Sequence, residues 1–234
     1  HGVVRCALGW ACWKTYVGRP ETDVVRRLAM SVLGNGLSDA RHHEDALSVF
    51  DAELSMQRRL GTSEEHILVA QSNLARTYQL LGQPEEALHV KRDVYFGYLK
   101  LKGEEHYETL REANNLAATL GSLERFVEAK SLFRKIMPVA RRVLGDGHEL
   151  TLKISFGYAQ TLYKLDDTLD DLHEAVTTLE DTGRIARRVF GGAHPTTDGI
   201  EHALRYVRDA VHAREGDDVS SVCAAVAKMT PGEA

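Results

Sequence analysis

The feature that most constrains this chain is an internal repeat with a period near 42 residues. Four glycines mark it, at spacings of 42, 42 and 46 residues: Gly61, Gly103, Gly145 and Gly191. Alanines keep the same register, with steps of 41, 42 and 46 residues: Ala46, Ala87, Ala129 and Ala175. Three histidines do so as well: His106, His148 and His194. Because a fixed period in several columns is typical of repeat architectures, we expect stacked copies of one small unit.

Each period contains two helix-like stretches, because its apolar residues recur at three- and four-residue spacing and not in strict alternation. In the second unit, Leu74 and Tyr78 lie on the apolar stripe of a first helix that ends at Gly82. Pro84 can begin a second helix, since the first turn needs no backbone N–H from it. Gly103 can end that helix, because glycine tolerates positive φ. The pattern therefore predicts a helical hairpin in each period.

A hairpin of this kind cannot bury its apolar stripe alone, so its neighbours must stack against it. The repeated alanines on the second helices are small enough to let the first helix of the same hairpin approach closely. The sequence therefore predicts an all-α fold, a right-handed superhelical solenoid of stacked antiparallel helix hairpins with a concave inner surface.

The second unit resembles a tetratricopeptide repeat, at residues 73–78 (NLARTY) and 82–87 (GQPEEA). The longer period and the junctions at residues 144–148 (LGDGH) and 190–196 (FGGAHPT) are similar to the repeats of kinesin light chains. The resemblance covers roughly residues 43 to 213. It implies a protein-interaction scaffold, and it is weak support for cargo transport, because this repeat subtype occurs in many scaffold and regulatory proteins.

The resemblance divides the chain into seven segments. They are a closing helix of a preceding repeat or an N-terminal cap (1–20), a degenerate repeat (21–61), two regular repeats (62–103 and 104–145), a repeat with an insertion around Asp166 to Asp171 (146–191), a last repeat helix (192–214), and a linker with a C-terminal capping helix (215–234). We expect Gly34-Asn35-Gly36 to form a turn, and Glu215 to Asp218 to separate the capping helix Val219 to Met229 from the array. We also expect the array to continue upstream of His1, unless residues 3–17 cap it.

The charge composition bears on whether the partner is a nucleic acid. The 234 residues include 29 Lys and Arg against 34 Asp and Glu, which gives a formal net charge of −5. This chain lacks the basic excess typical of phosphate-backbone binding, so we expect no nucleic-acid partner. The most apolar stretch, Val3 to Val17, is interrupted by Arg5 and Lys14 and is shorter than the roughly 20 residues that cross a bilayer.

Three cysteines, Cys6, Cys12 and Cys223, have neither CxxC spacing nor histidines at zinc-finger intervals. They predict no disulfide framework and no zinc site, and they favour a reducing compartment. We expect a cytoplasmic protein. An organelle is the alternative, because we expect a chain that starts at His1 without Met to be a fragment or a processed product.

The sequence offers no catalytic motif and no site for a cofactor. His42-His43-Glu44-Asp45 lacks the HExxH spacing of a metal site and predicts a surface helix start. The repeated histidines should lie one repeat apart in space, so we expect them to cap loops at the repeat junctions rather than to form a catalytic or metal set. Phosphate loops, nucleophile elbows and kinase signatures are absent. We therefore expect a non-enzymatic protein without cofactors.

In tetratricopeptide repeats the concave face is lined mainly by the first helix of each hairpin, just before and after its Leu-Ala pair. The resemblance therefore places eleven positions of this chain in a peptide-binding groove: Ser72, Asn73, Arg76, Gln79, Arg111, Asn114, Asn115, Ala118, Lys153, Phe156 and Gln160. The amides can pair with the backbone of an extended peptide, and the cations favour carboxylates or phosphates. We expect an acidic or C-terminal segment as ligand. The alternative is that these cations pair with carboxylates on neighbouring helices.

Two functional classes stay open. The first is an adaptor that recruits extended segments of other proteins into the concave groove. The second is a structural subunit, held permanently in a larger complex through its edges and capping helices. We expect the aromatic residues Trp10, Trp13, Tyr16, Tyr95, Phe96 and Tyr98 to pack in the core or between repeats. If residues 3–17 end the array, part of their face should be exposed and should mark a second contact surface.

Overall fold

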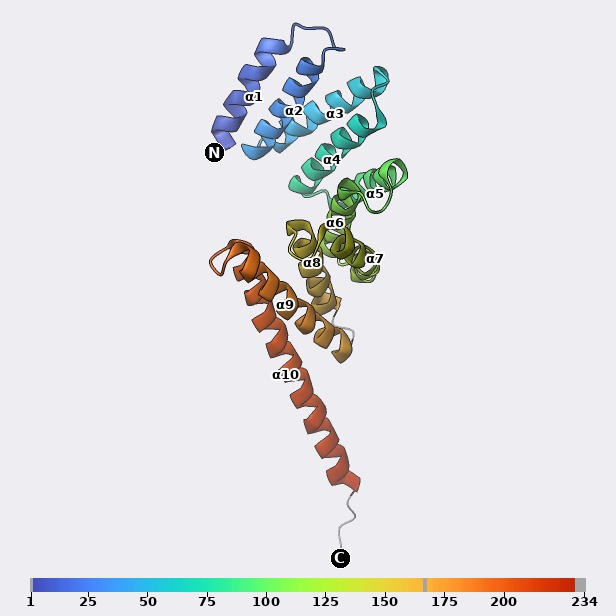
Figure 1. Ribbon diagram of the computed structural model, residues 1–234, viewed down its shortest axis with the longest axis vertical. Coiled ribbons are helices and arrows are strands. Elements are labelled where there is room, and N and C mark those ends of the chain that lie inside the picture. The colour runs from blue at the N-terminus through green and yellow to red at the C-terminus, as the bar shows by residue number, and fades with distance from the viewer. Residues whose placement is uncertain (1, 166–167, 230–234) are drawn as a thin grey trace, which may run out of the picture. The chain divides into compact units, whose positions relative to one another are not determined.

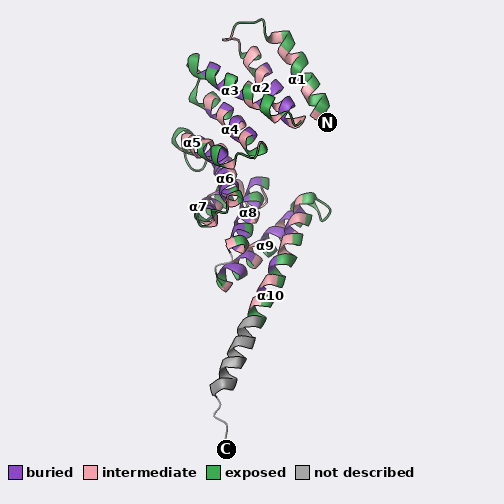
Figure 2. Ribbon diagram, turned by 180° about the vertical axis from the view of Figure 1, so that it is seen from behind, coloured by how far each residue is buried: buried purple, intermediate pink, exposed green. Residues whose placement is uncertain are grey.

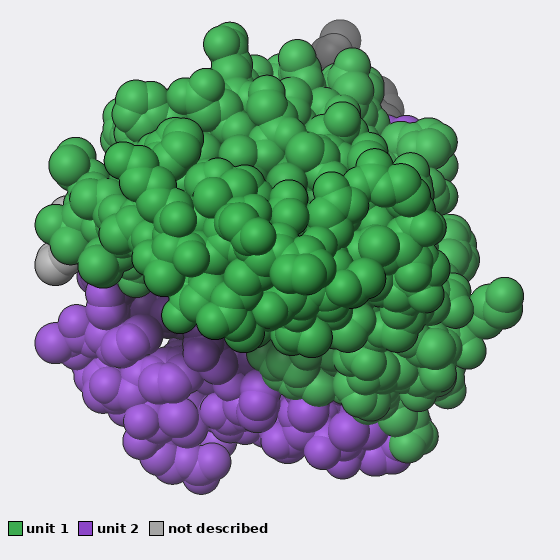
Figure 3. Space-filling view, turned by 90° about the horizontal axis from the view of Figure 1, so that it is seen from above, with its two compact units in different colours: residues 1–123 green, residues 124–234 purple. Residues whose placement is uncertain are grey.

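The computed structural model describes residues 2–165 and 168–229. These residues form ten helices and no strand (Figure 1): α1 Gly2–Tyr16, α2 Val24–Asp39, α3 His43–Arg59, α4 Glu64–Leu80, α5 Pro84–Lys102, α6 Tyr107–Ser122, α7 Phe126–Leu144, α8 Glu149–Leu165, α9 Leu169–Phe190 and α10 Pro195–Met229. They divide into two compact units, His1–Leu123 and Glu124–Ala234, called here the first unit and the second unit (Figure 3).

Within each unit, every helix packs against the next one along the chain. The first unit stacks α1 through α6 in this way, and the second unit stacks α7 through α10, where α10 also contacts α8. A contact between α8 and α10, which are first helices of successive hairpins, is what stacking requires. The predicted all-α solenoid of antiparallel hairpins is confirmed.

The repeated alanines lie at the centres of the helix contacts. The four on the second helices of the hairpins, Ala46, Ala87, Ala129 and Ala175, each have a relative exposure of 0%. Alanines on the first helices are equally buried at Ala75, Ala117 and Ala159. Figure 2 shows the resulting buried stripe along the helices of each unit. A larger side chain at such a position would force the helices apart, because a packed core has no spare volume.

The repeat junctions combine a glycine and a histidine. Gly103, Gly145 and Gly191 end their helices with φ of 84°, 86° and 85°, a backbone conformation that glycine adopts without strain. Three residues after each glycine stands a histidine, whose Nδ1 accepts a hydrogen bond from the backbone N–H two residues further along the chain. Glu108 N donates to His106 (3.2 Å), Leu150 N to His148 (3.1 Å) and Thr196 N to His194 (3.2 Å). The predicted capping role of the histidines is confirmed.

The predicted turn at residues 34–36 is wrong, because these residues lie inside α2. Glycine is needed at positions 34 and 36 because the neighbouring helices leave no room for a side chain. A Cβ on Gly34 would lie 2.6 Å from the ring of Phe50 in α3, and a Cβ on Gly36 would lie 2.6 Å from the carbonyl oxygen of Arg5 in α1. Gly9 of α1 also has little room, since a Cβ there would lie 3.0 Å from the Cα of Leu33. Tight packing on both sides of α2 therefore outweighs the low helix propensity of glycine.

The predicted linker at Glu215 to Asp218 is also wrong, because α10 runs through these residues without a break. The single Gly216 costs a helix about 1 kcal/mol, which does not by itself end it. Glu215 also lies 3.2 Å from Nε2 of His173 in α9, so the helix still packs on its neighbour at this point. In the insertion around Asp166 to Asp171, residues 166–167 lie outside the described residues, and Thr168 caps α9 by accepting from Asp171 N at 3.1 Å.

The expectation for the aromatic residues is met in part. Trp13 packs against the core of the first unit, and Tyr95 and Tyr98 are buried. Trp10 of α1 and Phe96 of α5 are 45% and 59% exposed, so for them the core prediction is wrong. Other apolar side chains of the first two helices are exposed as well: Val3, Val4 and Leu8 on α1, and Val25, Leu28 and Val32 on α2. Of the helices in the described part of the chain, none has the length and apolar character that crossing a lipid bilayer requires.

Replacing His106 by Ala should destabilise the first unit by about 1 kcal/mol, because the Glu108 N–H at the start of α6 loses its acceptor. His106→Asn should restore most of the stability, since asparagine is a good N-cap. Urea denaturation of both variants measures the effect. His202→Ala, at an exposed position within α10, is the control, and an equal loss there would contradict the capping role.

Candidate functional site

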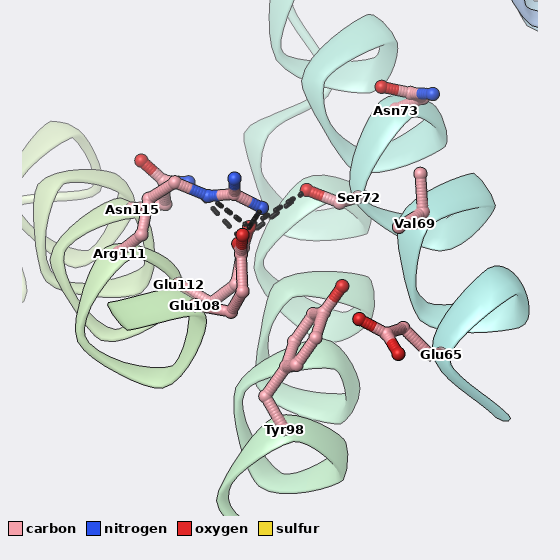
Figure 4. Close-up of a pocket in the computed structure, with 9 residues that line it drawn as sticks. All are labelled: Glu65, Val69, Ser72, Asn73, Tyr98, Glu108, Arg111, Glu112 and Asn115. Atoms are coloured by element: carbon pink, nitrogen blue, oxygen red, sulfur yellow. Dashed lines mark hydrogen bonds and ion pairs between the residues drawn. The ribbon is translucent and has the colours of Figure 1, made fainter. Parts of the chain in front are cut away.

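The first unit contains a pocket of about 330 Å³ between α4, α5 and α6 (Figure 4). Nine residues line it: Glu65, Val69, Ser72 and Asn73 from α4, Tyr98 from α5, and Glu108, Arg111, Glu112 and Asn115 from α6. Because α4 and α6 are the first helices of successive hairpins, this pocket lies on the helices that the sequence analysis assigns to the peptide-binding face. All of its lining belongs to one unit.

The carboxylate of Glu112 is the most buried charged group of the pocket, with a relative exposure of 1%. Three side chains donate hydrogen bonds to it. Ser72 Oγ on α4 lies 3.2 and 3.3 Å from its two oxygens, Asn115 Nδ2 lies at 3.2 Å, and Arg111 approaches with Nη2 at 2.8 Å and Nε at 3.1 Å. A buried carboxylate needs such donors and a counter-charge to stay ionised. Figure 4 shows them converging on it.

Arg111 connects this carboxylate with a second one. Its Nη2 also lies 2.6 Å from Oε2 of Glu108, which makes a second ion pair. Burial alone would lower the pKa of the guanidinium, but the hydrogen bond and the charge of Glu112 outweigh burial and raise that pKa. Arg111 is therefore a fixed cation whose charge is already matched within the pocket.

Two groups of the pocket have no hydrogen-bond partner among the described side chains. The Tyr98 ring is 1% exposed, and its hydroxyl points into the pocket (Figure 4). Burial, together with the charges of Glu108 and Glu112, raises the pKa of Tyr98 to about 12, so the hydroxyl keeps its proton at neutral pH. The amide of Asn73 is half-buried and likewise unpaired. A ligand can use both groups without breaking an internal hydrogen bond.

Lys91 of α5 supports the helices behind the pocket. Its Nζ donates to Gln79 Oε1 on α4 and to Thr119 Oγ1 on α6, both at 2.7 Å. Burial lowers the pKa of Lys91 from 10.5 to about 8, although the charge of Glu112 acts in the opposite direction. This buried amine joins three helices.

The structure brings only part of the predicted groove together. Ser72, Asn73, Arg111 and Asn115 line the pocket. Arg76 lies outside the lining and is 3.6 Å from Asp39 of α2, Gln79 accepts from Lys91, and Asn114 lies on α6 outside the lining. Ala118 also lies on α6 outside the lining, and the remaining predicted groove residues, Lys153, Phe156 and Gln160, lie on α8 in the second unit. Each of the three predicted cations has a carboxylate partner. Arg76 pairs with Asp39 and Arg111 with Glu112, and Lys153 lies 2.6 Å from Glu149.

Four functional groups of the pocket were not predicted from the sequence: the carboxylates of Glu65, Glu108 and Glu112 and the hydroxyl of Tyr98. One signal was available for Glu112. It precedes Leu116 by four residues, so it lies on the buried stripe of α6, where an acidic residue needs a partner. The other three show no such signal, because their positions depend on how the hairpins stack.

Residues 108–170 match a tetratricopeptide repeat family model, and residues 67–94 match a second tetratricopeptide repeat model. Both matches fall in the predicted repeats, so the predicted repeat class is confirmed. Among curated proteins, none matches this sequence.

Three solved structures show the same fold. The nearly identical repeats of a Podosopora anserina protein described as a kinesin light chain are 22% identical, with a TM-score of 0.70, over 87% of this chain and 96% of that one. BtubC (BKLC) from P. vanneervenii is 14% identical, with a TM-score of 0.64, over 89% and 91%. Rap protein complexed with Competence and Sporulation Factor is 14% identical, with a TM-score of 0.57, over 89% and 59%.

Stability should rise between pH 8 and pH 10 because of Lys91. In this window the unfolded chain keeps the lysine proton that the folded chain has released, so folding becomes more favourable as pH rises, by about 2 kcal/mol over the window. Tyr98 and Tyr158, whose pKa values are raised to about 12, reverse the trend only above pH 10. Urea denaturation across the window should show this rise in the wild type and not in Lys91→Met. An equal rise in the variant would contradict the assignment.

Proposed function

We propose that this chain, which carries tetratricopeptide repeats at residues 67–94 and 108–170, is a non-enzymatic adaptor that binds extended segments of other proteins. The unpaired amide of Asn73 in the pocket of the first unit supports this function. An amide both donates and accepts, so it can pair with the N–H and C=O of a peptide backbone in extended conformation. Asn73 lies beside groups that the Glu112 network fixes in place, which lowers the entropy cost of binding.

Arg76 is the cation best suited to a carboxylate of the bound segment. Its side chain is 54% exposed, and its one ion pair in the described structure, with Asp39, is long at 3.6 Å. A guanidinium has five N–H donors, so Arg76 can take a second carboxylate. Arg111 is unsuited, because the buried Glu112 already uses its charge. The proposed acidic residue of the ligand therefore lies next to Arg76.

The similar folds are consistent with binding. The Rap protein, whose structure contains a bound Competence and Sporulation Factor, shares the fold across most of this chain. The likeness is one of architecture, and it supports the general class of protein-interaction scaffold.

A specific observation also favours the second candidate, a structural subunit of a larger complex. The exposed apolar side chains of α1 and α2 include Val3 at 79%, Leu8 at 62% and Leu28 at 59% exposure. Neighbouring exposed apolar side chains of this kind mark contact surfaces on monomeric proteins. In this candidate the partner covers the α1–α2 end of the first unit and leaves the pocket open.

Asn73→Ala and Arg76→Ala should each weaken binding of peptides that were selected on the wild-type protein, by about tenfold, because each removes hydrogen bonds to the ligand. Isothermal titration calorimetry with the purified variants measures the loss. Lys135→Ala, at an exposed position of α7, is the matched control. Unchanged affinity in both groove variants would contradict the adaptor proposal.

Arg111→Ala should lower the free energy of unfolding by about 3 kcal/mol, because it leaves the Glu112 carboxylate buried without a cation. The double variant Arg111→Ala/Glu112→Gln should recover part of this loss, since a neutral amide needs no counter-charge. Chemical denaturation of the two variants tests the pairing. A fully stable Arg111→Ala would show that the ion pair is dispensable.

A further inference from the structure

The pocket of the first unit is acidic. Glu108 and Glu112 enter it from α6 and Glu65 enters it from the first turn of α4, on opposite sides of Tyr98 (Figure 4). Two cations oppose these three carboxylates, Arg111 on Glu108 and Glu112, and Lys102 at 2.6 Å from Glu65. One negative charge is left over, so the pocket is complementary to a single cation.

The polar atoms that remain open in the pocket are suited to accept hydrogen bonds. The side chains of Glu65 and Glu108 are 49% and 27% exposed, and the buried oxygen of Glu108 is the one that lies 2.6 Å from Arg111 Nη2. The Tyr98 hydroxyl is a further acceptor in the pocket. It is a polar group on an almost fully buried side chain, it points into the pocket, and no described residue hydrogen-bonds to it. A phenol oxygen that keeps its proton still has lone pairs to accept from an N–H donor.

A metal ion fits this arrangement poorly. The described residues contain no group of three His, Cys, Asp or Glu side chains placed closely enough to hold one. An organic cation needs no such convergence, because the several N–H bonds of an ammonium or guanidinium group point in different directions. At about 330 Å³, the pocket has room for a long side chain.

We propose that this pocket is a subsite for a lysine or arginine side chain of the bound segment, with Glu65, Glu108 and the Tyr98 hydroxyl as the accepting groups. The inference rests on the proposed adaptor function and adds a requirement to it. The ligand carries a basic residue at the pocket, besides the acidic residue next to Arg76. The apolar stem of the basic side chain packs beside Val69 and the Tyr98 ring, which line the same pocket.

The test selects binders to the full chain from a display library of random short peptides, and then measures their affinity for two variants. Tyr98→Phe removes one hydroxyl that has no internal partner, so it should leave folding intact. Glu65→Gln removes a charge near the surface, where ion pairs contribute little to stability. Glu85→Gln, an exposed carboxylate at the start of α5 outside the pocket, is the matched control.

We expect the selected peptides to share Lys or Arg at one position, and replacing that residue by Met to weaken binding about tenfold. Tyr98→Phe and Glu65→Gln should weaken the Lys or Arg peptide and change the Met peptide by less than about twofold, which shows coupling between pocket and side chain. Binders without a basic position, or equal affinity in both variants, would overturn the subsite and leave the adaptor proposal standing. A library without any binder would overturn both.

Discussion

The buried carboxylate of Glu112 determines which groups of the first unit remain available to a partner. At 1% exposure it needs every donor around it, so Ser72 of α4 and Arg111 and Asn115 of α6 are engaged by it. The same bonds connect the first helices of two successive hairpins and thus fix their relative position. The Asn73 amide and the Tyr98 hydroxyl stay unpaired, and they line the same pocket as this hydrogen-bonded network.

The local rules of the repeat were predictable from the sequence, because they depend on residues near one another along the chain. Spacing along the chain predicts the buried alanines. The chemistry of helix ends predicts the glycines that end the helices and the histidines that cap the next ones. The glycines of α2 were misjudged, because the close approach of α1 and Phe50 that requires them is a tertiary contact. The break at Glu215 was misjudged as well, since local composition does not report the contact with His173.

The candidate site was predicted less well, for a physical reason. Four of the predicted groove residues line the pocket. Which cation is available, however, depends on contacts between hairpins, such as that of Ser72 with Glu112, forty residues apart. The stacking of hairpins decides such pairs. Arg111 proves to be engaged by buried carboxylates and Arg76 only by a long ion pair, so two arginines that look equivalent in the sequence have different roles.

In the proposed function, partners bind on the α4–α6 face of the first unit and not at its α1 end. Photo-crosslinking can distinguish the two surfaces, with a crosslinking amino acid placed at Val69 in the pocket, at Leu8 on α1, or at Val127 on α7 as a control, all exposed positions. Each protein is irradiated in an extract of the source cells, and mass spectrometry identifies the crosslinked peptides. We expect partner segments crosslinked at Val69 and not at Val127. Partners crosslinked at Leu8 alone would contradict this expectation and would favour a permanent subunit.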